Sequence, residues 1–157
     1  MAAATLDWSA ALEPLALANS VATIGRGPTF AIAYEAALKL KETCGLHAEA
    51  FSAAEFHHGP IALVSVAYPV LLFRPNDEAA SGFSELANDL RRMGGCVLVA
   101  GAAAEDKGQL PTLPAYQPES DAICLIQSFY PLLAKLAASR GKNADQPRHL
   151  QKVTRTR

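Results

Sequence analysis

Short apolar runs alternate along this chain with longer stretches in which apolar residues recur at helical spacing, and this alternation constrains the fold most. Compact apolar runs that are typical of strands lie at 20–24, 69–73 and 96–100. Helical patterns cover 29–44, 77–93 and 122–139. Because strands that alternate with helices form parallel βαβ units, we expect an α/β fold. Its form should be a Rossmann-like three-layer α/β/α sandwich with a mostly parallel central sheet.

Glycine, proline and asparagine mark the expected ends of these elements. Pro28 stands at the first position of the helix over 29–44, and Gly45 stops that helix. Asn76-Asp77 predicts a turn and the N-cap of the next helix. Three weaker elements are expected: a short helix over 8–17 broken near Pro14, a helical turn over 53–57, and a short strand near 113–116.

The length of 157 residues predicts a single domain over 1–157, and half of the residues are apolar, enough for a proper core. Residues 1–19 are expected to form an N-terminal helix or linker. The α/β core should cover 20–140, and 141–157 should form a C-terminal tail.

The net charge and the cysteine content limit which partners and which cellular compartment are expected. The net charge of -1 gives no reason to expect nucleic acid or a membrane surface as a partner. No stretch is expected to reach the length of a membrane span, and the N-terminus lacks the features of a signal peptide. Three well-separated cysteines in apolar segments predict buried reduced thiols, which suits the cytoplasm.

The turn Gly25-Arg26-Gly27 follows a predicted strand and precedes a helix, so it lies at the edge of the sheet where ligands gather. Glycines let backbone N–H groups approach an anion, and a helix N-terminus favours negative charge. The same glycines also serve merely to turn the chain. Asp77 and Glu78, expected at the same edge, would repel a phosphate. A binding role and a structural role both stay open.

The helix over 34–42 carries Glu35, Lys39 and Glu42 at positions i, i+4 and i+7, so the three side chains share one face. One interpretation is a solvent-exposed face with an ion pair. The other is a carboxylate poised as a base beside an ammonium, which proton transfer between C1 and C2 of a sugar requires.

Histidine and glutamate are concentrated between residues 47 and 58, at His47, Glu49, Glu55, His57 and His58. This spacing fits no standard zinc pattern, so no metal is expected. Two interpretations remain besides a metal site. The segment could form a packed polar network around a buried loop, or it could carry an acid–base histidine.

Three blocks of the sequence resemble the sugar isomerase (SIS) domain family: ALKLKE followed by HAEAF and HHGP, then PVLLFRPNDE, and the tail DQPRHLQKVT. Within that family the chain is similar to the second SIS domain of the isomerase module of glutamine–fructose-6-phosphate amidotransferase (glucosamine-6-phosphate synthase). It is similar also to SIS-type glucosamine-6-phosphate deaminases. The resemblance covers nearly the whole chain after about residue 20 and implies a hexose 6-phosphate ligand and no cofactor.

The resemblance also implies roles for individual residues. Glu42 matches the general base of the aldose–ketose proton transfer, and Lys39 matches a lysine beside it in the sugar site. His58 matches the histidine that assists ring opening and that reaches the site of the partner subunit. Lys152 matches the tail lysine that contacts the open-chain sugar and forms a Schiff base with the ketose. Glu55 and the turn Gly25-Arg26-Gly27 are expected among the substrate-binding residues.

The chain also departs from the synthase pattern. It has Ala53-Ala54-Glu55, His57-His58-Gly59 and His149 where synthases differ, and these changes lean toward the deaminases. No S-x-S-G-x-T loop of the kind that holds the sugar phosphate in the first SIS lobe is present. We therefore expect a catalytic half that is inactive alone and works as a homodimer or paired with a first lobe. The alternative is a non-catalytic module for sugar-phosphate binding or dimerisation.

Overall fold

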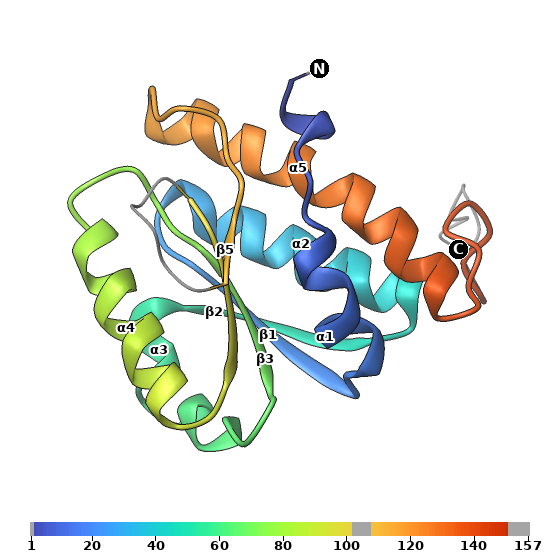
Figure 1. Ribbon diagram of the computed structural model, residues 1–157, viewed down its shortest axis with the longest axis horizontal. Coiled ribbons are helices and arrows are strands. Elements are labelled where there is room, and N and C mark those ends of the chain that lie inside the picture. The colour runs from blue at the N-terminus through green and yellow to red at the C-terminus, as the bar shows by residue number, and fades with distance from the viewer. Residues whose placement is uncertain (1, 102–107, 151–157) are drawn as a thin grey trace, which may run out of the picture.

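The computed structural model describes residues 2–101 and 108–150, and in it a parallel sheet lies between two layers of helices (Figure 1). The strands are β1 (Ser20–Gly25), β2 (His47–Ser52), β3 (Pro69–Phe73), β4 (Cys96–Ala100) and β5 (Gln109–Leu110). The α-helices are α1 (Leu12–Leu17), α2 (Pro28–Cys44), α3 (Ala53–Phe56), α4 (Ala80–Arg92) and α5 (Pro118–Ser139). Short 3-10 helices cover Ala3–Thr5, Ser9–Ala11 and Pro60–Leu63. The predicted α/β/α sandwich is confirmed.

The strand order is β2-β1-β3-β4-β5, and every neighbouring pair is parallel. From β1 the chain crosses through α2 to the edge strand β2, and the later strands then add on the other side of β1. The carboxyl ends of β1 and β3 therefore flank the point where the strand order reverses, which is the usual place for a ligand in such sheets.

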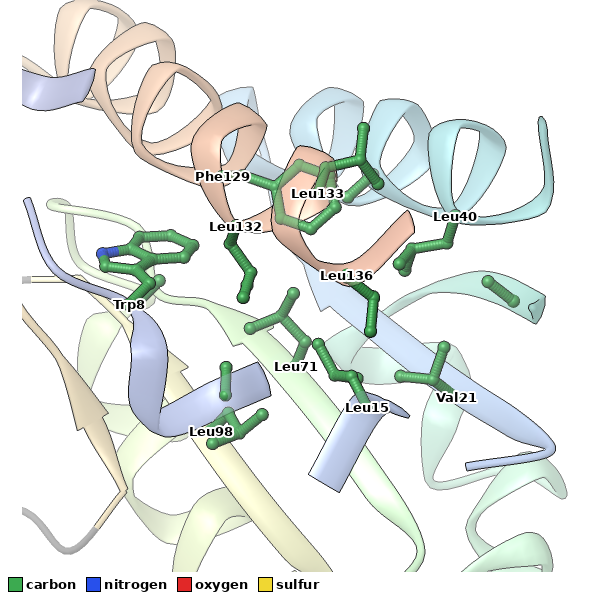
Figure 2. Close-up of a cluster of buried hydrophobic side chains, with 14 of the residues drawn as sticks. Trp8, Leu15, Val21, Leu40, Leu71, Leu98, Phe129, Leu132, Leu133 and Leu136 are labelled. Carbon is green, nitrogen blue, oxygen red and sulfur yellow. The ribbon is translucent and has the colours of Figure 1, made fainter. Parts of the chain in front are cut away.

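Alternating side chains of the central strands build a separate core on each face of the sheet. Leu71 and Phe73 of β3 pack toward α1, α2 and α5, while Val70 and Leu72 pack toward α3 and α4. Figure 2 shows part of the first core, in which residues of the helices meet those of the strands: Trp8, Leu15, Val21, Leu40, Leu71, Leu98, Phe129, Leu132, Leu133 and Leu136.

Three expected helices begin elsewhere or run on for longer than predicted. α5, expected over 122–139, begins at Pro118. α1 continues through Pro14, because a proline in the first turn removes an N–H that has no helical partner anyway. The helix expected from Asp77 begins instead at Ala80. The Asp77 carboxylate accepts a hydrogen bond from the N–H of Ala79 at 2.9 Å, so Asp77 closes a turn before the helix rather than capping the helix itself.

Two strands also differ from the prediction. The fourth strand was expected near 113–116, but β5 lies at Gln109–Leu110, where Leu110 is fully buried. Pro111 lies just before the expected segment and Pro114 lies within it. Proline lacks the backbone N–H that a strand donates to its neighbour in a sheet. β2 was not predicted at all, since the segment that forms it reads as a polar loop.

Helix α5 corrects the expectation that no segment reaches the length of a membrane span. It has 22 residues with a mean hydropathy of 1.4 in its most apolar window, enough by length and composition to cross a membrane. Half of that window is buried inside the domain. The apolar composition of α5 is thus accounted for by its packing against α2 and the sheet (Figure 1).

Arg140, directly after α5, ties the ends of three helices together. Its Nη1 donates to the carbonyls of Ala16 at 2.8 Å and Ala18 at 3.0 Å, and its Nε donates to the carbonyl of Cys44 at 3.1 Å. These carbonyls lie at the C-terminal ends of α1 and α2, where helices leave carbonyls unsatisfied. The guanidinium therefore fixes the C-terminal end of α2, whose last turn includes Glu42.

The three cysteines are free. Cys44 is buried, and burial is the main cause that raises the pKa of its thiol. Cys96 and Cys124 are half-buried. The predicted burial is confirmed for Cys44 and holds in part for the other two.

Candidate functional site

Helix α2 positions the charged face that the sequence singles out. Pro28 stands in its first turn, and Gly45 closes it in the left-handed conformation (φ 59°), with the turn hydrogen bond passing to the Leu40 carbonyl. Ala33, Ala36, Ala37 and Leu40 are buried against the sheet and α5. The face that carries Glu35, Lys39 and Glu42 is therefore left half-exposed.

Lys39 and Glu42 form the tightest ion pair of this face. The Lys39 Nζ lies 2.7 Å from Glu42 Oε2 and 3.9 Å from Glu35 Oε1. The hydrogen bond to Glu42 is the main cause that raises the pKa of Lys39, and the charge of Glu35 adds to it. Because the pKa is raised, Lys39 stays an ammonium at neutral pH and loses its proton only above its ordinary range. An ion pair between side chains this exposed stabilises the fold by about 1 kcal/mol at most. A role in a functional site therefore explains the pair better than a role in fold stability does.

A hollow of about 350 Å³ opens beside Glu42, between the end of α2 and the tail. Gly141 (φ 67°) follows the end of α5, and the N–H of Lys142 donates back to the Ala137 carbonyl at 2.8 Å, so the tail turns toward α2. The hollow is lined by Lys41, Glu42, Thr43, Gly45, Gly141, Lys142, Asn143, Gln146, Pro147 and Arg148. Three cations against one carboxylate favour an anionic ligand.

Lys152, the predicted Schiff-base lysine, lies outside the described residues, and its role stays a prediction. The described tail ends at Leu150, two residues before it.

His58 and Glu55 lie in a different hollow from Glu42. This second hollow is lined by Phe30, Tyr34, Glu49, Ala50, Phe51, Glu55, His58 and Pro60. Tyr34 precedes Glu42 by eight residues on α2, which corresponds to about 12 Å along the helix axis. The structure thus brings Lys39 to Glu42 but does not bring His58 to them within one chain. The service of His58 to the site of a partner subunit stays a prediction.

Glu55 has a structural task that the sequence pattern did not reveal. Its carboxylate accepts hydrogen bonds from the N–H and hydroxyl of Ser52 at 3.1 and 2.7 Å, and the Ser52 hydroxyl accepts from the N–H of Glu55. This capping box begins α3, and the Ser52 hydrogen bonds lower the pKa of Glu55. The predicted contact of Glu55 with substrate stays a prediction.

The histidine- and glutamate-rich segment is not a buried polar network, which corrects one of the interpretations above. Residues 47–52 form the edge strand β2, and His47, Glu49, His57 and His58 are exposed. Within 2–101 and 108–150, no three histidine, cysteine, aspartate or glutamate side chains come together as metal ligands would.

The turn Gly25-Arg26-Gly27 is closed largely by its own hydrogen bonds. The N–H of Arg26 donates to the Thr29 hydroxyl at 3.0 Å, and that hydroxyl donates to the Arg26 carbonyl. A Cβ at position 25 would lie 2.2 Å from the Thr29 carbonyl oxygen, so only glycine fits there. Asp77 and Glu78 share the adjoining hollow with Arg26. These facts give the turn a structural role, and its binding of substrate stays a prediction.

Tyr130 of α5 belongs to the charged face but was missed in the sequence. Its hydroxyl donates to Glu35 Oε1 at 3.2 Å, although the two residues lie 95 positions apart. Local spacing carries no signal for such a contact. Lys142 was likewise not assigned to the site, because a lysine in a basic tail looks like any solvated charge.

Comparison with known proteins agrees with this architecture. The glutamine–fructose-6-phosphate aminotransferase [isomerizing] of Escherichia coli K12 is 34% identical over 134 residues, which cover 82% of this chain and 22% of that protein. The chain thus spans about a fifth of the length of the curated relatives that it matches.

Solved structures with the same fold share the resemblance. A protein of Silicibacter pomeroyi DSS-3 assigned as a phosphosugar isomerase has a TM-score of 0.83 and 35% identity, over 92% of this chain and 44% of that one. The C-terminal domain of the glucosamine-fructose-6-phosphate aminotransferase from Francisella tularensis has a TM-score of 0.78 and 30% identity. That match covers 88% of this chain and 41% of the other. Residues 15–100, from α1 through β4, match the SIS domain family. Because this match covers more than half of the chain, the chain belongs to the SIS domain family.

Proposed function

We propose that this chain is a phosphosugar isomerase half-module that acts on amino-sugar 6-phosphates, as part of an isomerising aminotransferase or deaminase. Glucosamine 6-phosphate and fructose 6-phosphate are its expected ligands, and the cytoplasm is its expected compartment. The observation that carries the proposal is the Lys39–Glu42 pair at 2.7 Å, whose Glu42 lines a hollow with three cations. The names of the relatives, which are isomerising aminotransferases and isomerases, support the same substrate class.

The chemistry follows from the groups at the site. The Glu42 carboxylate takes the proton from C2 of the open-chain aldose as electrons move toward the carbonyl at C1, which gives an enediol or enolamine. The same carboxylate then returns the proton to C1. The enediol gives the ketose directly, whereas the enolamine gives an imine at C2, which water hydrolyses to the ketose and ammonia. The Lys39 ammonium donates a hydrogen bond to the carboxylate and orients it between these two steps.

Two further residues complete this mechanism. His58 would assist ring opening in the site of a partner subunit, since in its own chain it lies in a separate hollow. Lys152 would close over the open-chain sugar and form a Schiff base with the ketose carbonyl.

The proposal predicts that the chain alone does not release fructose 6-phosphate and ammonia from glucosamine 6-phosphate. Turnover should appear when a matching first SIS lobe is added, because that lobe supplies the serine- and threonine-rich loops that bind the phosphate. A coupled assay of fructose 6-phosphate measures both conditions. If a confirmed complex of the two lobes shows no turnover, the proposal fails for this substrate.

The alternative of a dimerisation module is favoured by one specific observation. Large apolar side chains are exposed on the outer faces of α2 and α5, namely Tyr34, Leu38, Ile123 and Tyr130. Because these two helices pack side by side (Figure 1), the four side chains lie on one layer of the domain. Exposed apolar surface of this kind is typical of a protein interface.

This apolar layer predicts that the chain self-associates at tens of micromolar, an ordinary range for interfaces of standard size. Sedimentation velocity should show a dimer whose fraction rises with concentration. The I123D variant should be monomeric, since a charge on the apolar layer would be desolvated on association. A strictly monomeric mass for the unaltered chain would contradict self-association.

A further inference from the structure

A row of four polar groups connects α5 with the end of α2. Tyr130 donates to Glu35 Oε1 at 3.2 Å, Glu35 Oε1 lies 3.9 Å from Lys39 Nζ, and Lys39 Nζ lies 2.7 Å from Glu42 Oε2. The row begins on one helix and ends at the carboxylate that we assign as the base. A change in α5 can therefore alter the interactions of Glu42 although α5 does not contact Glu42 in this row.

The distances show which carboxylate holds the ammonium. Lys39 is closer to Glu42 than to Glu35. In an isolated helix the opposite is expected, because a glutamate four residues before a lysine is the favoured ion pair. What distinguishes Glu35 here is that Oε1 already accepts the Tyr130 hydroxyl hydrogen. An oxygen that accepts this hydrogen bond attracts the ammonium less, so Lys39 remains with Glu42.

The packing of α5 fixes Tyr130 in this place. Phe129 and Leu133, which flank it on the same helix, are buried in the core. The rings of Phe129 and Tyr130 lie 6.4 Å apart between centroids. Burial and the charge of Glu35 raise the pKa of Tyr130, so its hydroxyl keeps its proton, and acts as a donor, throughout the neutral range.

We propose that Tyr130 is a positioning residue for the acid–base pair: by binding Glu35 it prevents that carboxylate from competing with Glu42 for the Lys39 ammonium. The inference rests on the proposed role of Glu42 as the base. Other charges face the same hollow as Glu42, namely Lys41 on α2 and Lys142 and Arg148 on the tail. Among the cations that the structure describes, Lys39 is the one in hydrogen-bond contact with Glu42.

The Tyr130→Phe variant tests the proposal, since it removes the hydroxyl and keeps the ring. The partner of Lys39 can be identified in the chain alone by NMR, from the scalar coupling across the hydrogen bond between Lys39 Nζ and a glutamate Cδ. We expect the coupling to Glu42 to weaken in Y130F and a coupling to Glu35 to appear. Tyr34→Phe is the matched control, because the Tyr34 hydroxyl makes no hydrogen bond within the described ranges, and we expect no change there.

A second substitution separates positioning from a general structural effect. Glu35→Gln removes the competing charge, so the double variant Y130F/E35Q should regain the coupling between Lys39 and Glu42. In the protein complemented with a first lobe, Y130F should lower kcat on the order of threefold at unchanged KM, the size expected for one exposed hydrogen bond. E35Q should restore kcat in the Y130F background.

The outcomes distinguish this inference from the proposed function. A coupling to Glu42 that is unchanged in Y130F, or that E35Q fails to restore, overturns the role of Tyr130. If the coupling moves as expected but the complemented protein turns over no amino-sugar phosphate, Tyr130 still positions Lys39 and the proposed reaction is what fails.

Discussion

Replacing Glu42 by glutamine should lower turnover of glucosamine 6-phosphate by a factor of about 10² to 10⁴ in the protein complemented with a first lobe, the range that a general base contributes. Glutamine has nearly the same shape as glutamate but cannot accept a proton at C2 and return it to C1. Ligand affinity should stay within roughly threefold, since the amide oxygen still accepts a hydrogen bond from the Lys39 ammonium. The expected pattern is a fall in kcat with little change in KM.

Steady-state kinetics and calorimetric titration of the ligand together check this prediction. Glu85→Gln is a suitable control, because Glu85 is exposed on α4, in the helix layer on the opposite face of the sheet. If E42Q loses binding in parallel with turnover, Glu42 holds the ligand rather than moving a proton. If E42Q retains wild-type turnover, the base is another residue and the assignment of the site is wrong.

The elements with a strong apolar period could be predicted from the sequence. β1, β3 and β4 form at the compact apolar runs, and α2 begins and ends where Pro28 and Gly45 indicate. These signals are local, because burial on both faces of a strand requires an apolar run and a helix end requires a special backbone conformation. The layer arrangement then follows from the βαβ rule.

The elements that were missed depend on contacts distant in sequence. β2 has a polar, alanine-rich sequence, of which only Ala48 is fully buried, and it is held by pairing with β1 in register from Ser20–His47 to Gly25–Ser52. β5 is two residues long and is defined by its ladder to β4. Neither strand has enough intrinsic β-propensity to show before its neighbour is known.

The contacts of the candidate site likewise divide into those that local spacing predicts and those that depend on packing between distant segments. The Lys39–Glu42 pair could be predicted, because i,i+3 spacing on one helix brings two side chains together wherever the helix lies. The contact of Tyr130 with Glu35 depends on how α5 crosses α2, which packing determines and spacing does not. For the same reason, local spacing carries no signal that His58 and Glu42 lie in separate hollows.

Phe129 supports the second prediction with a large effect, because α5 can hold Tyr130 only while the core beneath it is intact. Phe129 is fully buried, meets Phe73 of β3 edge-to-face at 6.3 Å between ring centroids, and lies among the leucines of the first core (Figure 2). Phe129→Ala removes the ring and leaves a cavity that the surrounding strands cannot fill. We expect the free energy of unfolding to fall by about 3–5 kcal/mol. That is a fifth or more of the roughly 5–15 kcal/mol that holds a domain of this size together.

Urea denaturation followed by circular dichroism, at one fixed protein concentration because self-association adds stability, measures the effect. The midpoint should fall while the m-value stays constant, which is the sign that native packing and not the unfolded state has changed. Leu17→Ala provides the matched control: Leu17 is 78% exposed at the end of α1, and its loss should change the free energy of unfolding by about 0.5 kcal/mol or less. A loss below about 1 kcal/mol in F129A would mean that the ring is not packed between α5 and β3. In that case the support that the core gives to Tyr130, and through it to the Lys39–Glu42 pair, would also be lost.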